Sequence, residues 1–349
     1  MTSLQALFGI ELPIIQAPMA GVQGSALAVA VSHAGGLGSL PCAMLTVDDM
    51  RRELAAIRAH TDKPFNANFF CHAPPVPDAA REAAWRAALA PYYRELGIAD
   101  AGVAAAPGRT PFSAEAADAL GDFKPAVVSF HFGLPSRDLL DRVRSWGSRI
   151  LSSATTVAEA RWLEAQGVDA IIAQGLEAGG HRGMFLSNDL TTQIGTFALL
   201  PQVVEAVNVP VIAAGGIVDA AGVAAAIALG AAGVQVGTAY LLCPEATTSA
   251  IHRAALKSEA SRHTAVTNVF TGRPARGIVN RLVAEVGPMS DEAPSFPLAL
   301  SAVAPLRAEA ERRGSGDFSP LWSGQNPTGC REIPAGDLTR ALCGAPRQG

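Results

Sequence analysis

Small residues end two neighbouring apolar segments in the second half of this sequence, and their placement is typical of a phosphate site. Gly215 and Gly216 follow one segment, and Gly237 and Thr238 follow the next. Glycines at strand ends let backbone N–H groups approach a phosphate, because no Cβ blocks the way. A following helix adds the partial positive charge of its N-terminus. We therefore predict phosphate binding here; the alternative is that these glycines only form tight turns.

His181 lies in a segment, residues 175–194, that shows no clear helix or strand pattern. Connections of this length in a compact domain are often functional, and several glycines surround the histidine. An imidazole, with an unperturbed pKa of about 6.5, suits proton transfer or a hydrogen bond to an anionic substrate near neutral pH. We predict a catalytic role for His181, against the alternative of a structural or exposed histidine. The adjacent Arg182 is expected to be structural and to pair with a carboxylate such as Glu177.

A proline and small residues follow the first apolar segment. Ala17, Pro18 and Met19 come directly after Gln16. A backbone that proline fixes and that carries little bulk could lie against a flat ring. This pattern predicts a planar ligand beside the first strand.

Amide, imidazole and indole side chains near other segment ends are further candidates. Of Asn66 and Asn68, we expect only Asn68 to face inward, where together with Gln174 it could read the donor and acceptor edge of a ring. His131 ends the fourth segment and is either a substrate-binding residue or a satisfied core histidine. Trp322 belongs to a loop rich in proline and glycine that would return to the same site, although it could equally anchor the last helix.

Eight short apolar segments recur along the chain, most of them followed by amphipathic or alanine-rich helical segments. The eight are residues 13–18, 37–40, 64–70, 126–132, 150–154, 170–174, 210–214 and 233–237. Eight strands that alternate with helices predict an α/β fold, a closed parallel (β/α)8 TIM barrel. An open doubly wound sheet, the alternative, would more usually show five or six strands.

Two segments exceed what a barrel of about 250 residues needs. Residues 71–124 and 241–317 each follow the carboxyl end of a predicted strand, the end at which barrel active sites lie. We predict that they form a smaller, mainly helical cap that contributes to the substrate site. The barrel itself would consist of residues 1–70, 125–240 and 318–349.

The composition indicates ample material for a core and no unusual charge. Of 349 residues, 49% are apolar and 17% are charged, with a net charge of −4. No acidic or basic block occurs, which argues against nucleic acid or an anionic membrane as the main partner. The five cysteines show no C-x-x-C spacing and predict neither a disulfide framework nor a zinc site. The N-terminus does not resemble a signal peptide, and glycines interrupt the apolar stretch 207–243, so we expect a soluble, cytoplasmic protein.

Several motifs together resemble the nitronate monooxygenases, also called 2-nitropropane dioxygenases. They are Gln16-Ala-Pro-Met-Ala-Gly, Gly35-Gly-Leu-Gly, Asn68, Gln174-Gly, Glu177-Ala-Gly-Gly-His-Arg-Gly, Ala213-Ala-Gly-Gly-Ile, Gln235-Val-Gly-Thr and Trp322-Ser-Gly-Gln. The resemblance runs nearly end to end. It implies a TIM barrel that depends on flavin mononucleotide (FMN), without metal. The implied reaction oxidises alkyl nitronates, such as propionate 3-nitronate, with O2 to a carbonyl compound and nitrite, as in nitroalkane detoxification.

The motifs and the resemblance together define the predicted site. His181 matches the active-site histidine of the family, and His131 is a candidate substrate contact. The predicted FMN-binding residues are Ala17, Pro18, Met19, Asn68, Gln174, Gly179, Gly180, Gly215, Gly216, Gln235, Val236, Gly237, Thr238, Trp322 and Gln325. A nitronate carries electron density on carbon and could give one electron to the flavin. His181 could hydrogen-bond the nitro oxygens or remove the α-proton of a neutral nitroalkane.

Other functions stay open at this point. FMN-dependent NAD(P)H:quinone reductases and enoyl-thioester reductases resemble this sequence too, and they take electrons from a nicotinamide cofactor. A phosphate-binding barrel isomerase or lyase without flavin would use His181 as acid and base, and a non-catalytic flavin-binding module is a third alternative. The physiological nitro compound, the oligomeric state and the choice between base and binding group for His181 are also open.

Overall fold

Eight parallel strands form the centre of the computed structural model, which describes residues 3–99 and 109–344. They are β1 (Ile14–Gln16), β2 (Gly38–Pro41), β3 (Phe65–Phe70), β4 (Val127–His131), β5 (Arg149–Ala154), β6 (Ala170–Gln174), β8 (Val211–Ala214) and β9 (Gly233–Val236). The sheet order is β1-β9-β8-β6-β5-β4-β3-β2. Its two ends meet, because Gln16 N–H donates to Leu37 O at 3.0 Å and Leu37 N–H donates to Ile14 O at 2.9 Å. The prediction of a (β/α)8 barrel is confirmed.

Helices surround this sheet, and several of them begin at residues whose side chains cap them. Those of the barrel wall are α2 (Ser25–His33), α3 (Val47–His60), α5 (Ala114–Gly121), α6 (Arg137–Ser145), α7 (Val157–Ala165), α8 (Thr196–Ala206), α9 (Ala220–Ala228) and α13 (Ala335–Leu342). Side-chain oxygens of Thr46, Thr156 and Asp219 accept backbone N–H groups in the first turns of α3, α7 and α9, which stabilises these helix starts. The last helix, α13, packs against α2 and α9 and completes the wall.

The barrel has an inner and an outer core, as the alternation of side chains along a strand requires. Ile15, Leu37 and Ile212 point into the barrel, together with Leu4 and Phe8 of the short helix α1 (Leu4–Phe8). The opposite faces of the strands pack against the helices. Burial of both faces explains why the strands read as continuous apolar segments.

Asn66 and Asn68 both face the barrel interior, so the expectation that only one of them does is wrong. Residues two apart in a strand share a face. Asn66 Nδ2 donates to Ser39 Oγ at 3.0 Å and Asn68 Nδ2 donates to Ser129 Oγ at 2.9 Å, whereas Ala67 between them packs in the outer core.

A smaller lobe with its own apolar core lies beside the barrel. Its helices are α4 (Ala79–Leu96), α11 (Arg281–Val286) and α12 (Ala299–Arg312). α4 packs along α12, and Trp85 Nε1 donates to Ala299 O at 3.2 Å. Three strands, β10 (Thr264–Thr267), β11 (Ala275–Ile278) and β7 (Gly180–His181), form an antiparallel sheet. The expectation of a mainly helical insertion therefore missed this sheet. The remaining elements are α10 (Ala250–Lys257), η1 (Leu190–Thr192), η2 (Thr238–Leu242) and η3 (Glu259–Arg262).

The first insertion is shorter than the predicted 71–124. Helix α5 lies within that range, yet it packs against α3 and α6 of the barrel. Ala117 and Leu120 belong to the outer core of the barrel. The small lobe thus receives α4, and the barrel receives α5.

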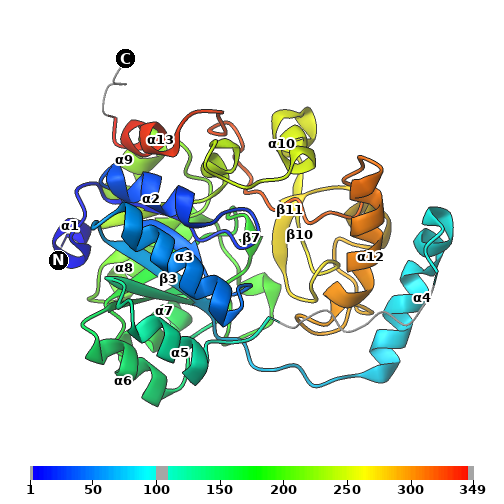
Figure 1. Cartoon of the computed structure of the whole chain (residues 1–349), viewed down its shortest axis with the longest axis horizontal. Helices are drawn as coiled ribbons and strands as arrows, with labels where there is room; N and C mark the ends of the chain where they lie inside the picture. Colours follow the sequence, from blue (N-terminus) through cyan, green and yellow to red (C-terminus); the bar gives the residue numbers. More distant parts are fainter. Residues whose placement is uncertain (1–2, 100–108, 345–349) are drawn as a thin grey trace.

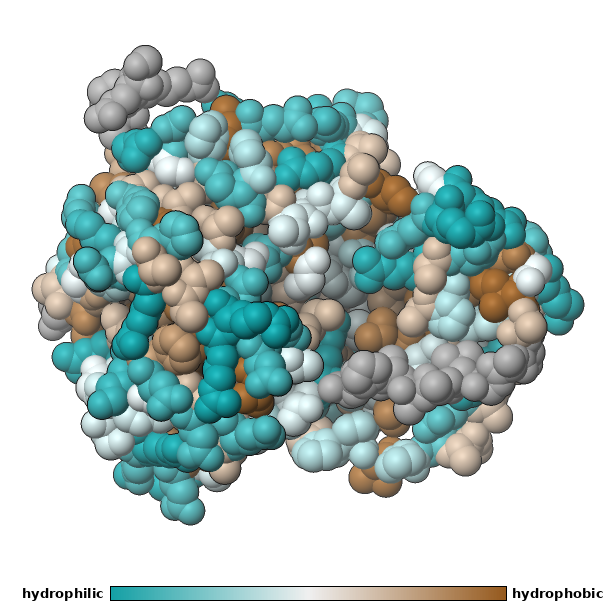
Figure 2. Space-filling model, viewed as in Figure 1, coloured by the Kyte–Doolittle hydropathy of each residue, from teal (hydrophilic) through white to brown (hydrophobic). Residues whose placement is uncertain are grey.

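Figure 1 shows the two lobes side by side, with the labelled ends of the chain on the barrel side and α4 and α12 on the other side. The face of the molecule in Figure 2 is hollowed between the lobes. Across residues 3–99 and 109–344, no helix combines the length and the hydropathy that a membrane span needs.

Candidate active site

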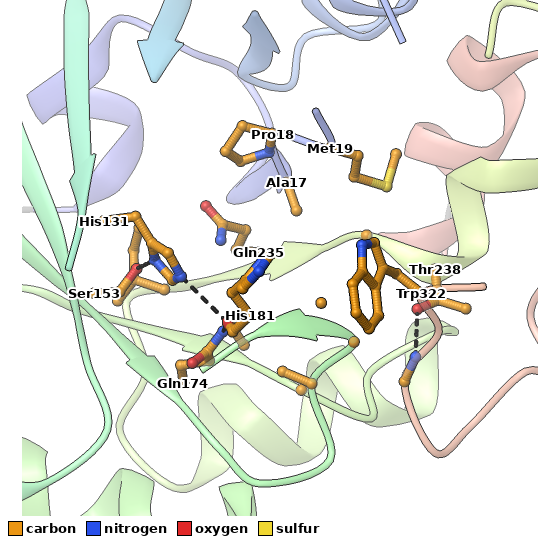
Figure 3. A pocket seen from close by; sticks show the side chains of 18 of the residues that line it. Ala17, Pro18, Met19, His131, Ser153, Gln174, His181, Gln235, Thr238 and Trp322 are labelled. Atoms are coloured by element: carbon orange, nitrogen blue, oxygen red, sulfur yellow. Dashed lines mark hydrogen bonds between the residues drawn. The ribbon is translucent and has the colours of Figure 1, made fainter. Parts of the chain in front are cut away.

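A pocket opens at the carboxyl ends of the barrel strands (Figure 3). Its wall includes residues at the ends of β3, β4, β6, β8 and β9 and the loop that carries Trp322.

The pocket brings together nearly all of the predicted site residues. Those that line it are Ala17, Pro18, Met19, Asn68, His131, Gln174, Gly179, Gly180, His181, Gly215, Gly216, Gln235, Gly237, Thr238 and Trp322. Figure 3 shows Ala17, Pro18 and Met19 on one side of it and Gln174 on the other. Val236 and Gln325 are not among the lining residues. Val236 packs in the outer core of the barrel, and Gln325 donates its backbone N–H to Glu177 O at 3.0 Å.

Backbone donors characterise the end of the pocket at β8 and β9. In the described part of the chain, no protein atom accepts a hydrogen bond from the N–H groups of Gly216 or Gly237. Gly215 has a φ of +124°, and a Cβ there would lie 2.6 Å from Thr196 Oγ1. Only glycine fits this turn without strain. These free N–H groups suit the phosphate predicted for this end.

A buried side-chain acceptor lies in the same pocket. Gln235 Oε1 is buried and has no hydrogen-bond partner, which costs free energy unless a ligand donates to it. A ring N–H, such as that of a flavin, would satisfy this oxygen. An unpaired acceptor beside free backbone donors is the pattern that a phosphate-tailed heterocycle fits.

Gln174 is committed to the protein itself rather than free to read a ring. Its Nε2 donates to His181 O at 3.0 Å, and its Oε1 accepts the Gly183 N–H at 2.7 Å. The amide therefore fixes the segment that carries His181 above the end of β6.

His181 is placed by β7 at the junction of the two lobes. β7 pairs with β11, with His181 opposite Ala275. The imidazole Nε2 lies 2.9 Å from Thr271 Oγ1, and the rings of Phe296 and Trp322 lie 5.3 and 5.5 Å away. Burial, reinforced by nearby positive groups led by Arg109, lowers the pKa of His181 well below its usual value. The imidazole is therefore neutral at pH 7.

His131 also lines the pocket, but both of its ring nitrogens are engaged. Nε2 lies 3.2 Å from His181 O, and Nδ1 lies 3.0 Å from Ser153 Oγ. Because a carbonyl only accepts, Nε2 carries the proton and Nδ1 accepts from the serine. Burial lowers the pKa of His131 to about 3. These contacts make His131 a support for the His181 segment.

Arg182 is structural, as expected, but its expected pairing with Glu177 is wrong. The guanidinium is fully buried and donates to Gly175 O at 2.6 Å, Gln174 O at 2.8 Å and Gln193 Oε1 at 3.1 Å. Glu177 instead accepts from the N–H and hydroxyl of Thr196. The carbonyl oxygens of Gln174 and Gly175 lie together at the buried guanidinium and accept its N–H groups, so Arg182 needs no carboxylate partner.

Sequence reasoning missed several residues that surround His181. Phe70 and Arg109 line the pocket, and the rings of Phe132 and Phe296 pack against Phe70 with centroids 4.8 and 6.2 Å away. His72, which lies in the first predicted insertion, is buried with its ring centre 4.8 Å from that of Phe296. These residues carry no motif, since they come from strand ends and insertions that only the fold brings together.

The closed parallel barrel has free backbone donors, an unpaired amide acceptor and a neutral histidine at its mouth. This arrangement is typical of cofactor-dependent barrel enzymes. The nitronate monooxygenase family model matches residues 1–344, and the chain belongs to this family of flavin-dependent oxidoreductases. The resemblance inferred from the sequence motifs is confirmed.

Individual relatives agree with this assignment. The chain is 46% identical to a nitronate monooxygenase of Paraburkholderia phytofirmans, covering 97% of this chain and 93% of that protein. It is 44% identical to one of Pseudomonas aeruginosa, with 96% of each covered. A crystallised nitroalkane oxidase from Streptomyces ansochromogenes superposes with a TM-score of 0.89 at 40% identity, covering 98% of this chain and 97% of that one. FabK from Thermotoga maritima superposes at 0.74 with 27% identity, covering 99% and 96%.

Proposed function

We propose that this protein is an FMN-dependent enzyme that oxidises alkyl nitronates, such as propionate 3-nitronate, with O2 to a carbonyl compound and nitrite. One observation carries the proposal: free backbone donors, a buried unpaired amide oxygen and a neutral histidine line one pocket. Membership of the nitronate monooxygenase family supports the choice of substrate class.

The chain offers distinct groups to each part of FMN. Gly216 and Gly237 would donate backbone N–H groups to the phosphate, and Gln235 Oε1 would accept from the ring. Ala17 and Pro18 present little bulk along the opposite wall. When bound, the flavin supplies the electron acceptor for the nitronate and the means of passing electrons to O2.

His181 acts here as a hydrogen-bond donor rather than as a strong base. Its lowered pKa keeps the imidazole neutral, and a neutral imidazole donates one N–H to a nitro oxygen. The same lowered pKa makes it a weak acceptor of the α-proton of a nitroalkane. The site therefore suits a nitronate, which arrives already deprotonated, better than the neutral nitroalkane.

Rapid mixing without oxygen tests this function. We expect bleaching of the flavin absorbance by ethyl nitronate and not by NADH, followed in air by release of nitrite. Bleaching by NADH alone would favour the reductase alternative, which the similarity to FabK keeps relevant. A protein that stays colourless with added FMN would favour the isomerase or lyase.

A further inference from the structure

Arg109 presents a guanidinium to the pocket, and no atom in the described part of the chain accepts a hydrogen bond from it. It is a lining residue, its Cζ lies 5.4 Å from the ring centre of Phe296 and 6.0 Å from that of Phe70, and its Nε is buried without a hydrogen bond. Among residues 3–99 and 109–344, no carboxylate forms an ion pair with it. Burial lowers the pKa of Arg109 to about 10, so it is still charged at pH 7.

Other arginines of the same lobe junction have acceptors. Arg182 donates to two carbonyl oxygens and to Gln193. Arg276 donates to Leu176 O at 2.9 Å and to Thr264, and Arg253 donates to the carbonyls of Leu242 and Cys243. Burying a guanidinium without such acceptors costs free energy. An unpaired one that faces a ligand pocket is therefore best explained by an anion that pairs with it when bound.

The charges around the pocket favour an anion. No aspartate or glutamate occurs among the described residues that line it, and Arg109 is its one lining arginine within that part of the chain. Arg273 lies just behind the wall, with its Cζ 4.0 Å from the ring centre of Phe132. Both guanidinium charges act on His181, where they add to burial in lowering its pKa.

The distance from His181 limits the size of the ligand. Phe296 lies between the two groups, with its ring centre 5.3 Å from that of His181 and 5.4 Å from Arg109 Cζ. The imidazole centre and the guanidinium carbon are therefore at most 10.7 Å apart, the sum of these two distances. Hydrogen-bonded contacts at both ends take up about 3 Å each, so a ligand that reaches both groups can have only a short spacer.

We propose that Arg109 forms an anion subsite that binds a carboxylate on the substrate, two or three carbons away from the nitronate group held at His181. A planar carboxylate matches the paired N–H groups of a guanidinium. This inference rests on the proposed function for the identity of the reacting group. It assigns to Arg109 the selection of nitronates of short nitrocarboxylic acids over those of simple nitroalkanes.

Steady-state kinetics with a matched pair of substrates test the specificity. The nitronates of 3-nitropropionate and 1-nitrobutane place a carboxylate or an apolar group at similar reach. We expect Arg109→Met to lower kcat/KM about 50-fold for the first, the scale of losing a charge-assisted hydrogen bond, and less than about 3-fold for the second. Arg109→Lys should retain part of the preference, because it keeps the charge. Arg86→Met, which removes an exposed arginine of α4, is the control and should change neither.

Binding of an unreactive analogue separates this proposal from the reaction. Succinate carries two carboxylates at the spacing of a nitronate and a carboxylate. By calorimetry, Arg109→Met holoprotein should bind succinate at least about 10-fold more weakly than the wild type, whereas the control Arg86→Met should bind it like the wild type. Equal affinity of the wild type and Arg109→Met for succinate, or equal kinetic losses on both nitronates in Arg109→Met, would overturn the subsite. Arg109-dependent succinate binding without nitronate turnover would overturn the proposed reaction and leave the subsite standing.

Discussion

The two ends of the pocket are built in opposite ways. At β8 and β9, the ligand would meet backbone N–H groups of Gly216 and Gly237 on strands of the barrel itself. Around His181, it would meet side chains that come largely from the small lobe and from long connections, with rings packed between positive groups. The first end offers backbone groups, which suit a phosphate whatever the side chains, and the second can differ among proteins with the same barrel. If FMN and a nitronate bind as proposed, cofactor binding and substrate choice are separated in space.

Replacing Gly215 by alanine should have the largest effect and should act on the cofactor end alone. The new Cβ would lie 2.6 Å from Thr196 Oγ1 at a φ of +124°, and such strain costs about 1–3 kcal/mol before any loss of phosphate contacts. We expect FMN affinity to fall by about 100-fold or more, measured by fluorescence titration of the apoprotein.

Gly314→Ala is the matched control for this substitution. Gly314 also has a positive φ, of +80°, but a Cβ there meets no atom within 4 Å. It should retain full FMN binding. Unchanged affinity in Gly215→Ala would show that the phosphate does not lie at this turn.

His181→Leu tests the other end and should affect catalysis while leaving the flavin bound. Leucine has no N–H donor, so kcat/KM for a nitronate should fall by about 100-fold, the worth of one well-placed donor. Neutral nitroalkanes should lose no more than this, because the lowered pKa makes His181 a poor base for their α-proton. Stopped-flow reduction with both substrates gives the two values. A clearly larger loss with the neutral nitroalkane would show that His181 acts as a base.

Thr271 should have a smaller influence, exerted through His181. Its hydroxyl lies 2.9 Å from His181 Nε2 and thereby orients the imidazole. Thr271→Val should reduce kcat about 5-fold for a nitronate with little change in KM, since a neutral hydrogen bond is worth about 1 kcal/mol. The substitution should also shift the pH profile of kcat. Thr271→Ser keeps the hydroxyl and should restore both. A loss of equal size in the serine variant would indicate packing instead.

Stability, as distinct from activity, should depend on pH through the buried histidines. Burial lowers the pKa of His72 and His252 to about 4 and that of His131 to about 3. The unfolded chain therefore binds more protons below about pH 6.5, and the free energy of unfolding falls as pH drops from 6.5 towards 4, by up to about 1.4 kcal/mol per pH unit for each histidine.

Urea unfolding between pH 7.5 and 4.5 measures this dependence. His131→Gln should give a shallower slope than the wild type, and His60→Gln, at an exposed position of α3, should leave it unchanged. A slope of the opposite sign would contradict burial of neutral imidazoles.

The contrast between the two ends also explains what the sequence could predict. Gly215, Gly216 and Gly237 were identifiable because a turn or close approach restricts the residue type and because each ends an apolar strand. His181 was identifiable from its long glycine-rich connection. Arg109 was not, since it follows a segment without periodicity and its role depends on Phe296, which is far away in the sequence.

Three differences between the predictions from the sequence and the structure have related physical causes. The partners of Arg182 are carbonyl oxygens, which every residue has and which therefore leave no pattern in the sequence. The strands β10 and β11 have four residues each, too few for a clear alternation. The assignment of α5 to the barrel depends on which helices it packs against, and an amphipathic helix has the same pattern in either lobe.

The dipeptide His181-Arg182 has a consequence for how the molecule exchanges its ligands. His181 pairs with Ala275 of the small lobe, while the buried Arg182 side chain is held by the carbonyls of Gln174 and Gly175 at the end of β6. In addition, the Arg276 side chain of β11 donates a hydrogen bond to Leu176 O. A rotation of the small lobe away from the barrel would have to break the Arg276 bond and either the pairing of β7 with β11 or the hydrogen bonds of Arg182. We therefore expect substrate and product to pass while both lobes remain docked.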